Sequence, residues 1–292
     1  MPPSDIVARA NSTIVEIGRQ QLRVVVQQAG VGRPLLLING IGATGDLFDG
    51  LRTQLDDRET ITFDAPGVGG SPTPVAPYSM RQLAATVAGL ITHLGHERVD
   101  VLGVSWGGAL AQELAYRHSD AVHRLILAAT MPGFLSVPGR PAALAILMSP
   151  ARYYSPDYLK RIAPTLYGGA IRDAPELLEE HARQRASRPP TRRGYLYQLH
   201  AIQRWTSLPW LHRLPQRTLV LAGNRDPIVR LVNGRFLADR IPDARLHVLD
   251  GGGHLFLFTD AEEMADIIRD FLQTGATKAR NQLRRSQGHR RS

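Results

Sequence analysis

The stretch Val99-Asp-Val-Leu-Gly-Val-Ser-Trp-Gly107 predicts a buried strand that runs through a sharp turn into a helix. Its first residues are mostly apolar and β-branched, and residues 109–116 continue with helical spacing. The turn has the pattern Gly-x-Ser-x-Gly, in which glycines let neighbouring backbone pass close by. A serine at such a turn presents its hydroxyl at the carboxyl end of the strand. The stretch therefore predicts Ser105 as a nucleophile in an α/β fold.

On both sides of this stretch, short apolar runs alternate with amphipathic segments. Residues 12–18 and 20–28 predict an antiparallel hairpin, and later strands are expected at residues 34–39, 60–64, 123–128, 218–222 and 245–249. Helices are expected at residues 46–55, 79–94, 231–240 and 261–273. This order is typical of an α/β fold with a mostly parallel sheet covered by helices on both faces.

One long segment interrupts the alternation. The residues between the strands at 123–128 and 218–222 are rich in proline and hold Trp205 and Trp210. A connection of that length has structure of its own in a compact domain. We expect an inserted helical cap over residues 131–214, with an apolar lining above Ser105. The core would then comprise residues 12–130 and 215–275.

The amino-acid composition limits the classes of protein to which the chain can belong. Of the 292 residues 43% are hydrophobic and 21% charged, as in ordinary globular proteins. The absence of cysteine excludes disulfides, thiolate catalysis and cysteine-bound metals. Residues 1–10 hold no apolar run of a signal peptide, and no stretch has the roughly 20 apolar residues of a membrane span. We therefore expect a cytoplasmic protein without a transmembrane segment.

The net charge of +9 is concentrated at one end of the chain. Six basic residues and no acid lie within residues 278–292, and without them the chain carries only +3. Residues 276–292 are thus predicted to form a basic, disordered tail, and no nucleic-acid binding is predicted. The tail is either a solvated segment without special role or an electrostatic attachment to an anionic surface or partner.

A serine nucleophile needs a base and a group that orients the base. Asp226 follows the strand at 218–222, and His254 follows the last strand after three glycines. This gives the order nucleophile, acid, histidine, with each residue at the carboxyl end of a strand. Asp64 and Asp250 also end strands and are the alternative acids. Of the other histidines, His93, His96 and His118 lie in predicted helices or at their ends, His247 in a strand, and His200 and His212 in the cap, so His254 is the predicted base.

The oxyanion formed during acyl transfer needs two backbone N–H donors. One is predicted at Trp106, directly after the nucleophile, and the other at Ile41, in the glycine-containing loop after the strand at 34–39. The Trp106 side chain either lines the pocket or packs beneath it. The glycine run at residues 67–70 precedes two prolines rather than a helix, which disfavours a dinucleotide site. No cofactor and no metal are predicted.

The chain resembles the intracellular depolymerases of medium-chain-length poly(3-hydroxyalkanoate), which belong to the α/β-hydrolases. The similar core segments are Asn39-Gly-Ile-Gly-Ala43, Phe63-Asp-Ala-Pro-Gly-Val-Gly-Gly70, Gly103-Val-Ser-Trp-Gly-Gly-Ala-Leu-Ala-Gln112, Leu219-Val-Leu-Ala-Gly223 and Gly253-His-Leu-Phe-Leu257. In the cap they are Val137-Pro-Gly139, Arg161-Ile-Ala-Pro-Thr165, Tyr167-Gly-Gly169 and Trp205-Thr-Ser207. The family's catalytic serine, aspartate and histidine fall on Ser105, Asp226 and His254.

This resemblance implies a serine esterase that cleaves a polyester through an acyl-enzyme on Ser105 and releases 3-hydroxy fatty acids. It implies a polyester granule or hydrophobic ester as partner, and a location at intracellular storage granules. Asn224-Arg225 and an extra glycine before His254 depart from the family pattern. The core motifs also fit a small-molecule carboxylesterase, a carbon–carbon bond hydrolase or a non-catalytic ligand receptor. The cap segments favour the depolymerase, while endo- or exo-cleavage and the oligomeric state stay open.

Overall fold

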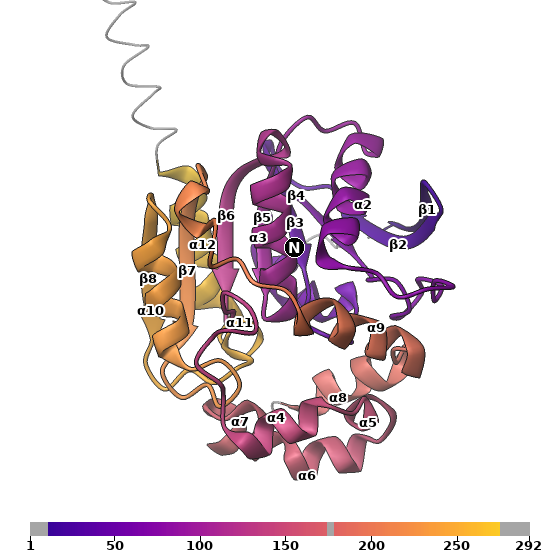
Figure 1. The fold of residues 1–292 in the computed structure, drawn as a ribbon, viewed down its shortest axis with the longest axis vertical. Helices are drawn as coiled ribbons and strands as arrows, with labels where there is room; N and C mark the ends of the chain where they lie inside the picture. Colours follow the sequence, from indigo (N-terminus) through magenta and orange to yellow (C-terminus); the bar gives the residue numbers. More distant parts are fainter. Residues whose placement is uncertain (1–10, 174–177, 275–292) are drawn as a thin grey trace, which may run out of the picture.

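A computed structural model of the chain describes residues 11–173 and 178–274 (Figure 1). The predicted tail at residues 276–292 lies outside these residues, as do residues 1–10. Eight strands form one sheet in the order β1-β2-β4-β3-β5-β6-β7-β8. Their bounds are β1 Asn11–Ile17, β2 Gln20–Gln27, β3 Gly32–Ile38, β4 Arg58–Phe63, β5 Val99–Val104, β6 Val122–Ala128, β7 Arg217–Gly223 and β8 Ala244–Leu249.

The sheet is mostly parallel, as the sequence predicts. Strands β3 to β8 pair in parallel, whereas β1 pairs with β2, and β2 with β4, in antiparallel fashion. Side chains of β3 alternate between two apolar clusters, with Leu36 and Ile38 in one and Leu35 and Leu37 in the other. Because successive side chains of a strand point to opposite faces, both faces of the sheet are buried.

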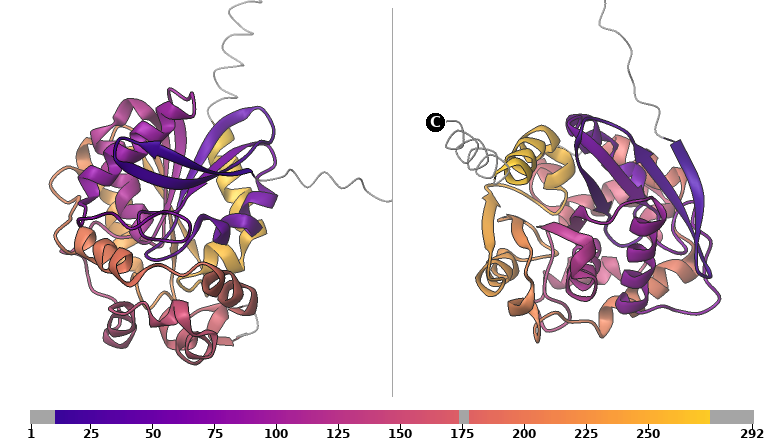
Figure 2. Two further views of the ribbon diagram at one scale, coloured as in Figure 1. Left: turned by 90° about the vertical axis from the view of Figure 1, so that its right-hand side faces the viewer. Right: turned by 90° about the horizontal axis from the view of Figure 1, so that it is seen from above.

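Helices cover both faces (Figure 2). Side chains of α2, α3 and α10 belong to the first apolar cluster and those of α1, α11 and α12 to the second. Their bounds are α1 Asp49–Gln54, α2 Met80–His93, α3 Trp106–Arg117, α10 Leu231–Arg240, α11 Phe256–Thr259 and α12 Ala261–Gln273. The helix expected at residues 46–55 is a 3₁₀ turn, η1 Gly45–Phe48, followed by α1. The tighter turn buries the consecutive residues Leu47 and Phe48.

The segment between β6 and β7 is helical and lies below the sheet in Figure 1. We call residues 131–214 the cap. It holds α4 Pro141–Leu147, α5 Ala151–Tyr154, α6 Pro156–Tyr167, α7 Ala170–Asp173, α8 Leu178–Ser187, α9 Arg192–Gln203 and η4 Leu211–Arg213. Its apolar cluster includes Leu159, Leu166 and Leu178, and it also takes in Ile228 and Leu255 from loops of the core. The cap therefore packs against the loops that follow β7 and β8.

The two connections of the cap to the core run side by side. Gly133 and Thr206 form an isolated antiparallel bridge, and Phe134 N donates to Trp205 O (3.1 Å). The Trp205 indole donates to Glu113 Oε2 on α3 (2.8 Å), while Trp210 stacks on a tyrosine of the same helix. The cap is thus anchored to α3, the helix that begins directly after the serine turn.

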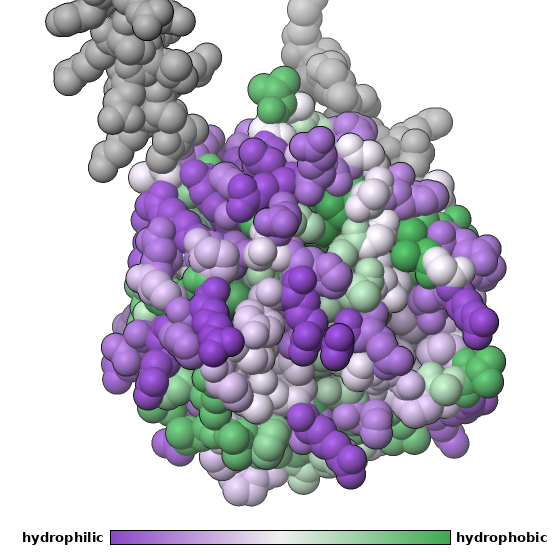
Figure 3. Space-filling view, turned by 45° about the horizontal axis from the view of Figure 1, so that its top comes forward, coloured by the Kyte–Doolittle hydropathy of each residue, from purple (hydrophilic) through white to green (hydrophobic). Residues whose placement is uncertain are grey.

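The face seen in Figure 3 is mainly hydrophilic, and apolar side chains appear on it in separate groups. Within residues 11–173 and 178–274, no helix has the length and apolar character needed to cross a membrane.

Candidate active site

Ser105 occupies a strained turn between β5 and α3. Its φ of 54° and ψ of −117° are values that a non-glycine residue rarely adopts. The backbone is held there by Ser105 N, which donates to Ala128 O on the neighbouring strand (2.9 Å). A Cβ on Gly103 would lie 2.4 Å from Gly107 O, and one on Gly107 would lie 2.2 Å from Ile38 O. The two glycines are therefore required by close backbone packing, and the serine hydroxyl is left partly exposed.

Gly107→Ala tests this packing. We expect the substitution to lower the free energy of unfolding by at least about 2 kcal/mol, since the new methyl group collides with backbone that cannot rotate away. Urea denaturation measures the effect. Gly50→Ala on α1 is the matched control: its Cβ meets nothing within 4 Å, and alanine favours a helix by up to about 1 kcal/mol. A Gly107→Ala protein as stable as the control would contradict the close contact.

His254 and Asp226 form a buried pair. The distance from His254 Nδ1 to Asp226 Oδ2 is 2.7 Å. The second carboxylate oxygen accepts hydrogen bonds from the amides of Ile228 (2.8 Å) and Val229 (2.9 Å), which fixes its orientation. With an ionised aspartate at Nδ1, the imidazole proton sits on Nδ1 and Nε2 is free to accept one. His254 N also donates to Tyr167 O of the cap (2.7 Å).

The alternative acids have other partners. Asp64 is fully buried, and its carboxylate accepts from two loop amides and from Arg23. Burial raises the pKa of Asp64. Asp250 is exposed and accepts from the Asn224 side chain (2.6 Å). In the described part of the chain neither carboxylate is hydrogen-bonded to His254, so Asp226 is the acid that the fold brings to this histidine.

The loop after β3 provides one amide suited to an oxyanion. Gly40 N donates to the Asn39 side chain (2.8 Å), and Gly42 N donates to Gln198 Oε1 of the cap (2.7 Å). Between them, Ile41 N has no acceptor among the described residues. The loop and Ser105 line one cavity, so this amide lies near the serine.

Trp106 supplies an amide at the first position of α3, where helical N–H groups have no partner within the helix. Its side chain is buried, and the indole donates to Gln198 O (2.9 Å). It is not among the side chains that line the cavity at Ser105. Of the two roles open for this side chain, the structure supports packing.

Ser105 and His254 line the same small cavity, of about 50 Å³. The loop after β3, apolar side chains such as Leu147, Ile228 and Phe258, and cap residues enclose it. The expectation of an apolar cap lining is wrong in part, because Arg152 and Arg185 also face the cavity. The space is small beside the roughly 300–1,000 Å³ of ordinary ligand pockets.

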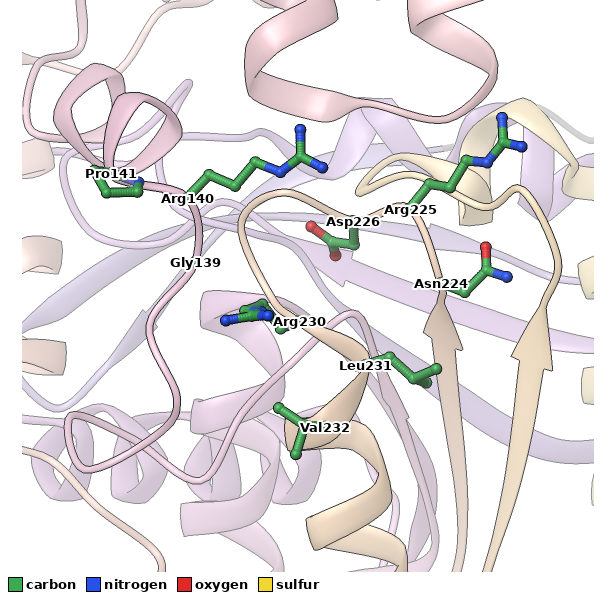
Figure 4. Close-up of a pocket in the computed structure, with 9 residues that line it drawn as sticks. All are labelled: Gly139, Arg140, Pro141, Asn224, Arg225, Asp226, Arg230, Leu231 and Val232. Carbon is green, nitrogen blue, oxygen red and sulfur yellow. The ribbon is translucent and has the colours of Figure 1, made fainter.

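Asp226 also lines a second, wider cavity, of about 480 Å³ (Figure 4). Arg140, Arg225 and Arg230 project around it from the cap and from the loop after β7. Its lining includes Asp226 but neither Ser105 nor His254. The arginine that departs from the family pattern, Arg225, therefore lies at this outer groove and not in the cavity of the serine.

Sequence reasoning missed the cap residues that reach the site. Gln198 accepts hydrogen bonds from the Gly42 amide and from the Trp106 indole, and the Tyr153 hydroxyl donates to Ile41 O. These contacts join residues about 90 to 160 positions apart, so no local pattern signals them. Within the described residues, no cluster of three or more histidine and acidic side chains is arranged to hold a metal ion.

This combination of a mostly parallel sheet, a strained serine turn and a histidine–aspartate pair after the last two strands defines a class of enzyme. Residues 33–261 match the family described as alpha/beta hydrolase fold. The chain belongs to the α/β-hydrolase family and is a hydrolase.

Individual hydrolases are similar to this chain over most of its length. The chain is 47% identical over 267 residues to the poly(3-hydroxyalkanoate) depolymerase of Ectopseudomonas oleovorans, covering 91% of this chain and 93% of that protein. The family resemblance inferred from the sequence is thereby confirmed. Identity to 2-hydroxymuconate semialdehyde hydrolase of Pseudomonas putida is 30%, over 88% of this chain and 94% of that one. A thermophilic esterase from Thermogutta terrifontis superimposes with a TM-score of 0.76 at 26% identity, covering 90% and 98% of the two chains.

Proposed function

We propose that this chain is a serine esterase that depolymerises poly(3-hydroxyalkanoate), with Ser105, His254 and Asp226 as its catalytic triad. The observation that carries the proposal is that Ser105 and His254 line the same cavity. His254 is hydrogen-bonded to one carboxylate oxygen of Asp226, and the other oxygen accepts from two backbone amides. The polyester substrate is supported by the 47% identity to a depolymerase over 91% of this chain.

In the proposed reaction, His254 Nε2 takes the hydroxyl proton as Ser105 Oγ attacks the ester carbonyl carbon. The carbonyl oxygen becomes an oxyanion that accepts from the Ile41 and Trp106 amides. His254 then gives the proton to the departing alcohol oxygen as the C–O bond breaks. Water, deprotonated by His254, attacks the acyl-enzyme and frees a 3-hydroxy acid, and the proton returns to Ser105.

The size of the cavity bears on how a polymer binds. A volume of about 50 Å³ is smaller than a medium-length acyl chain, so part of a bound chain lies outside this cavity. Large apolar side chains on the cap are well exposed and offer contacts to a hydrophobic granule surface. They are Phe134, Leu135, Val137, Met148, Tyr154 and Leu196.

The substrate class is tested with granules and soluble esters. Purified protein should release 3-hydroxy acids from medium-chain polyester granules, and chromatography of the soluble products identifies them. On p-nitrophenyl esters, kcat/KM should rise from two-carbon to about eight-carbon acyl chains, because each buried methylene contributes about 0.8 kcal/mol, or nearly fourfold. A maximum at acetate, with no acid released from granules, would instead indicate a small-molecule esterase.

A further inference from the structure

Two buried arginines of the cap face the cavity of the nucleophile. Arg152 on α5 is 3% exposed and Arg185 on α8 is 6% exposed. Both line the cavity together with Ser105 and His254. A cavity built for neutral esters alone has no use for two cations, so their surroundings decide what they are for.

Neither guanidinium has an acidic partner among the described side chains. Arg152 Nη1 donates to Ser149 O (3.1 Å) and to the Tyr195 hydroxyl (2.8 Å). Arg185 Nη1 donates to the Tyr167 hydroxyl. The Nε atoms of both arginines are buried without a hydrogen-bond partner. Each of the two arginines therefore has at least one buried N–H group without an acceptor in the described part of the protein.

Tyrosine rings surround both arginines but do not neutralise them. The Arg152 guanidinium lies 4.6 Å from the centre of the Tyr153 ring, and that of Arg185 lies 5.4 Å from the same ring. Burial raises the pKa of Tyr195 to about 12, so its phenol stays neutral and donates to Leu147 O. Arginine stays protonated in proteins. Ring contacts of this kind offset only part of the cost of burying an unpaired charge.

Three other buried arginines are paired with acids, whereas a fourth, Arg124, donates to the backbone carbonyls of Leu272 and Thr274. Arg23 contacts two aspartates (2.8 and 3.3 Å), Arg52 contacts Asp49 (3.2 Å), and Arg58 contacts Asp57 (2.6 Å). Among the described side chains Arg152 and Arg185 have no carboxylate partner, and unlike Arg124 they face the cavity of Ser105. A carboxylate of the substrate would supply the acidic partner that these two arginines lack among the described side chains.

We propose that Arg152 and Arg185 bind the free carboxylate at the end of a 3-hydroxyalkanoate chain, which directs Ser105 to the terminal ester bond. This inference rests on the proposed esterase function. In the terminal unit the carboxylate is only two carbons away from the carbon that bears the ester oxygen, so both groups fit a short cavity. Internal units carry neutral esters in the same place and gain nothing from the arginines.

The reaction then runs from the carboxyl end. Ser105 Oγ bonds to the carbonyl carbon of the penultimate unit, and the bond from that carbon to the terminal unit's oxygen breaks. His254 protonates that oxygen, which frees a 3-hydroxyalkanoate from the polymer. Its carboxylate is still bound to the arginines at this point. The shortened chain stays on Ser105 until water releases it with a new carboxylate end.

A pair of dimers tests the inference. The ester of two 3-hydroxyoctanoate units is assayed with its carboxylate free and as the methyl ester, and kcat/KM is compared. Charge-assisted hydrogen bonds should make the free acid about 10- to 100-fold better. In Arg152→Met and Arg185→Met this ratio should fall toward one, mainly through a higher KM for the acid. Arg185→Lys should keep part of it. Arg192→Met removes an exposed arginine of α9 and should keep the full ratio.

Binding without turnover gives a second readout. Calorimetric titration of Ser105→Ala protein with 3-hydroxyoctanoate should show binding at least about tenfold tighter than with its methyl ester. The difference should vanish when Arg185→Met is added. Because that change removes an unpaired buried charge, the thermal midpoint should hold or rise. A purely structural arginine would lower the midpoint and leave the ratio of the dimers unchanged.

The outcomes separate the two proposals. Equal kcat/KM for acid and methyl ester, together with equal binding, overturns the carboxylate site and leaves the esterase standing. Failure to cleave either dimer or p-nitrophenyl octanoate overturns the esterase, while the titration still reports whether the arginines bind a carboxylate.

Discussion

Ser105→Ala should reduce kcat for p-nitrophenyl octanoate by about 10⁴- to 10⁶-fold. The hydroxyl is the proposed nucleophile, and water without the acyl-enzyme step has only the oxyanion amides to assist it. The fold should persist, because alanine keeps the backbone and Cβ that the strained turn already accommodates. Steady-state kinetics measures the loss, and thermal melting should place the variant within a few degrees of the natural protein.

Ser79→Ala serves as the control, because it should lower the stability of the protein without lowering its activity. Ser79 caps α2, where its hydroxyl accepts from Gln82 N (3.2 Å) within a capping box. Its loss should cost about 1 kcal/mol of stability and leave kcat unchanged. More than about a tenth of the natural activity in Ser105→Ala would refute the serine mechanism.

His254→Ala should be nearly as damaging as Ser105→Ala. Without the base, nothing removes the hydroxyl proton, and because members of a triad act as a unit the double variant should lose little more than either single one. Asp226→Asn should cost about 10²- to 10⁴-fold, since an amide favours the wrong imidazole tautomer at Nδ1. Kinetics of the single and double variants on one ester measures the coupling.

His247→Ala is the matched control for this set. His247 lies on β8 outside the cavity and should keep its kcat. Fully additive losses in the Ser105→Ala/His254→Ala double variant would mean that the two side chains act independently.

Much of the fold follows from local sequence. The helices at residues 231–240 and 261–273 have the bounds that their apolar spacing predicts, and the strand, turn and helix around Ser105 lie where the Gly-x-Ser-x-Gly pattern places them. Periodicity identifies these elements because each buries a face whose residues are neighbours in sequence. Asp226 and His254 are predicted for a related reason, since parallel strands place the loops after them at one edge.

The cap contacts were decided by tertiary structure. Gln198 lies 156 positions from the Gly42 amide it accepts from, and Tyr195 lies 43 positions from Arg152. From the sequence, an arginine in a proline-rich segment is expected to be solvent-exposed, because most arginines are. Its burial depends on which helices pack around it, and that choice is made by the apolar cluster the cap shares with loops of the core. The sequence by itself thus determined the sheet, the serine turn and the order of the proposed catalytic residues. Only the packing of the cap, a set of long-range contacts without a local pattern, decided that two charged side chains would face the nucleophile.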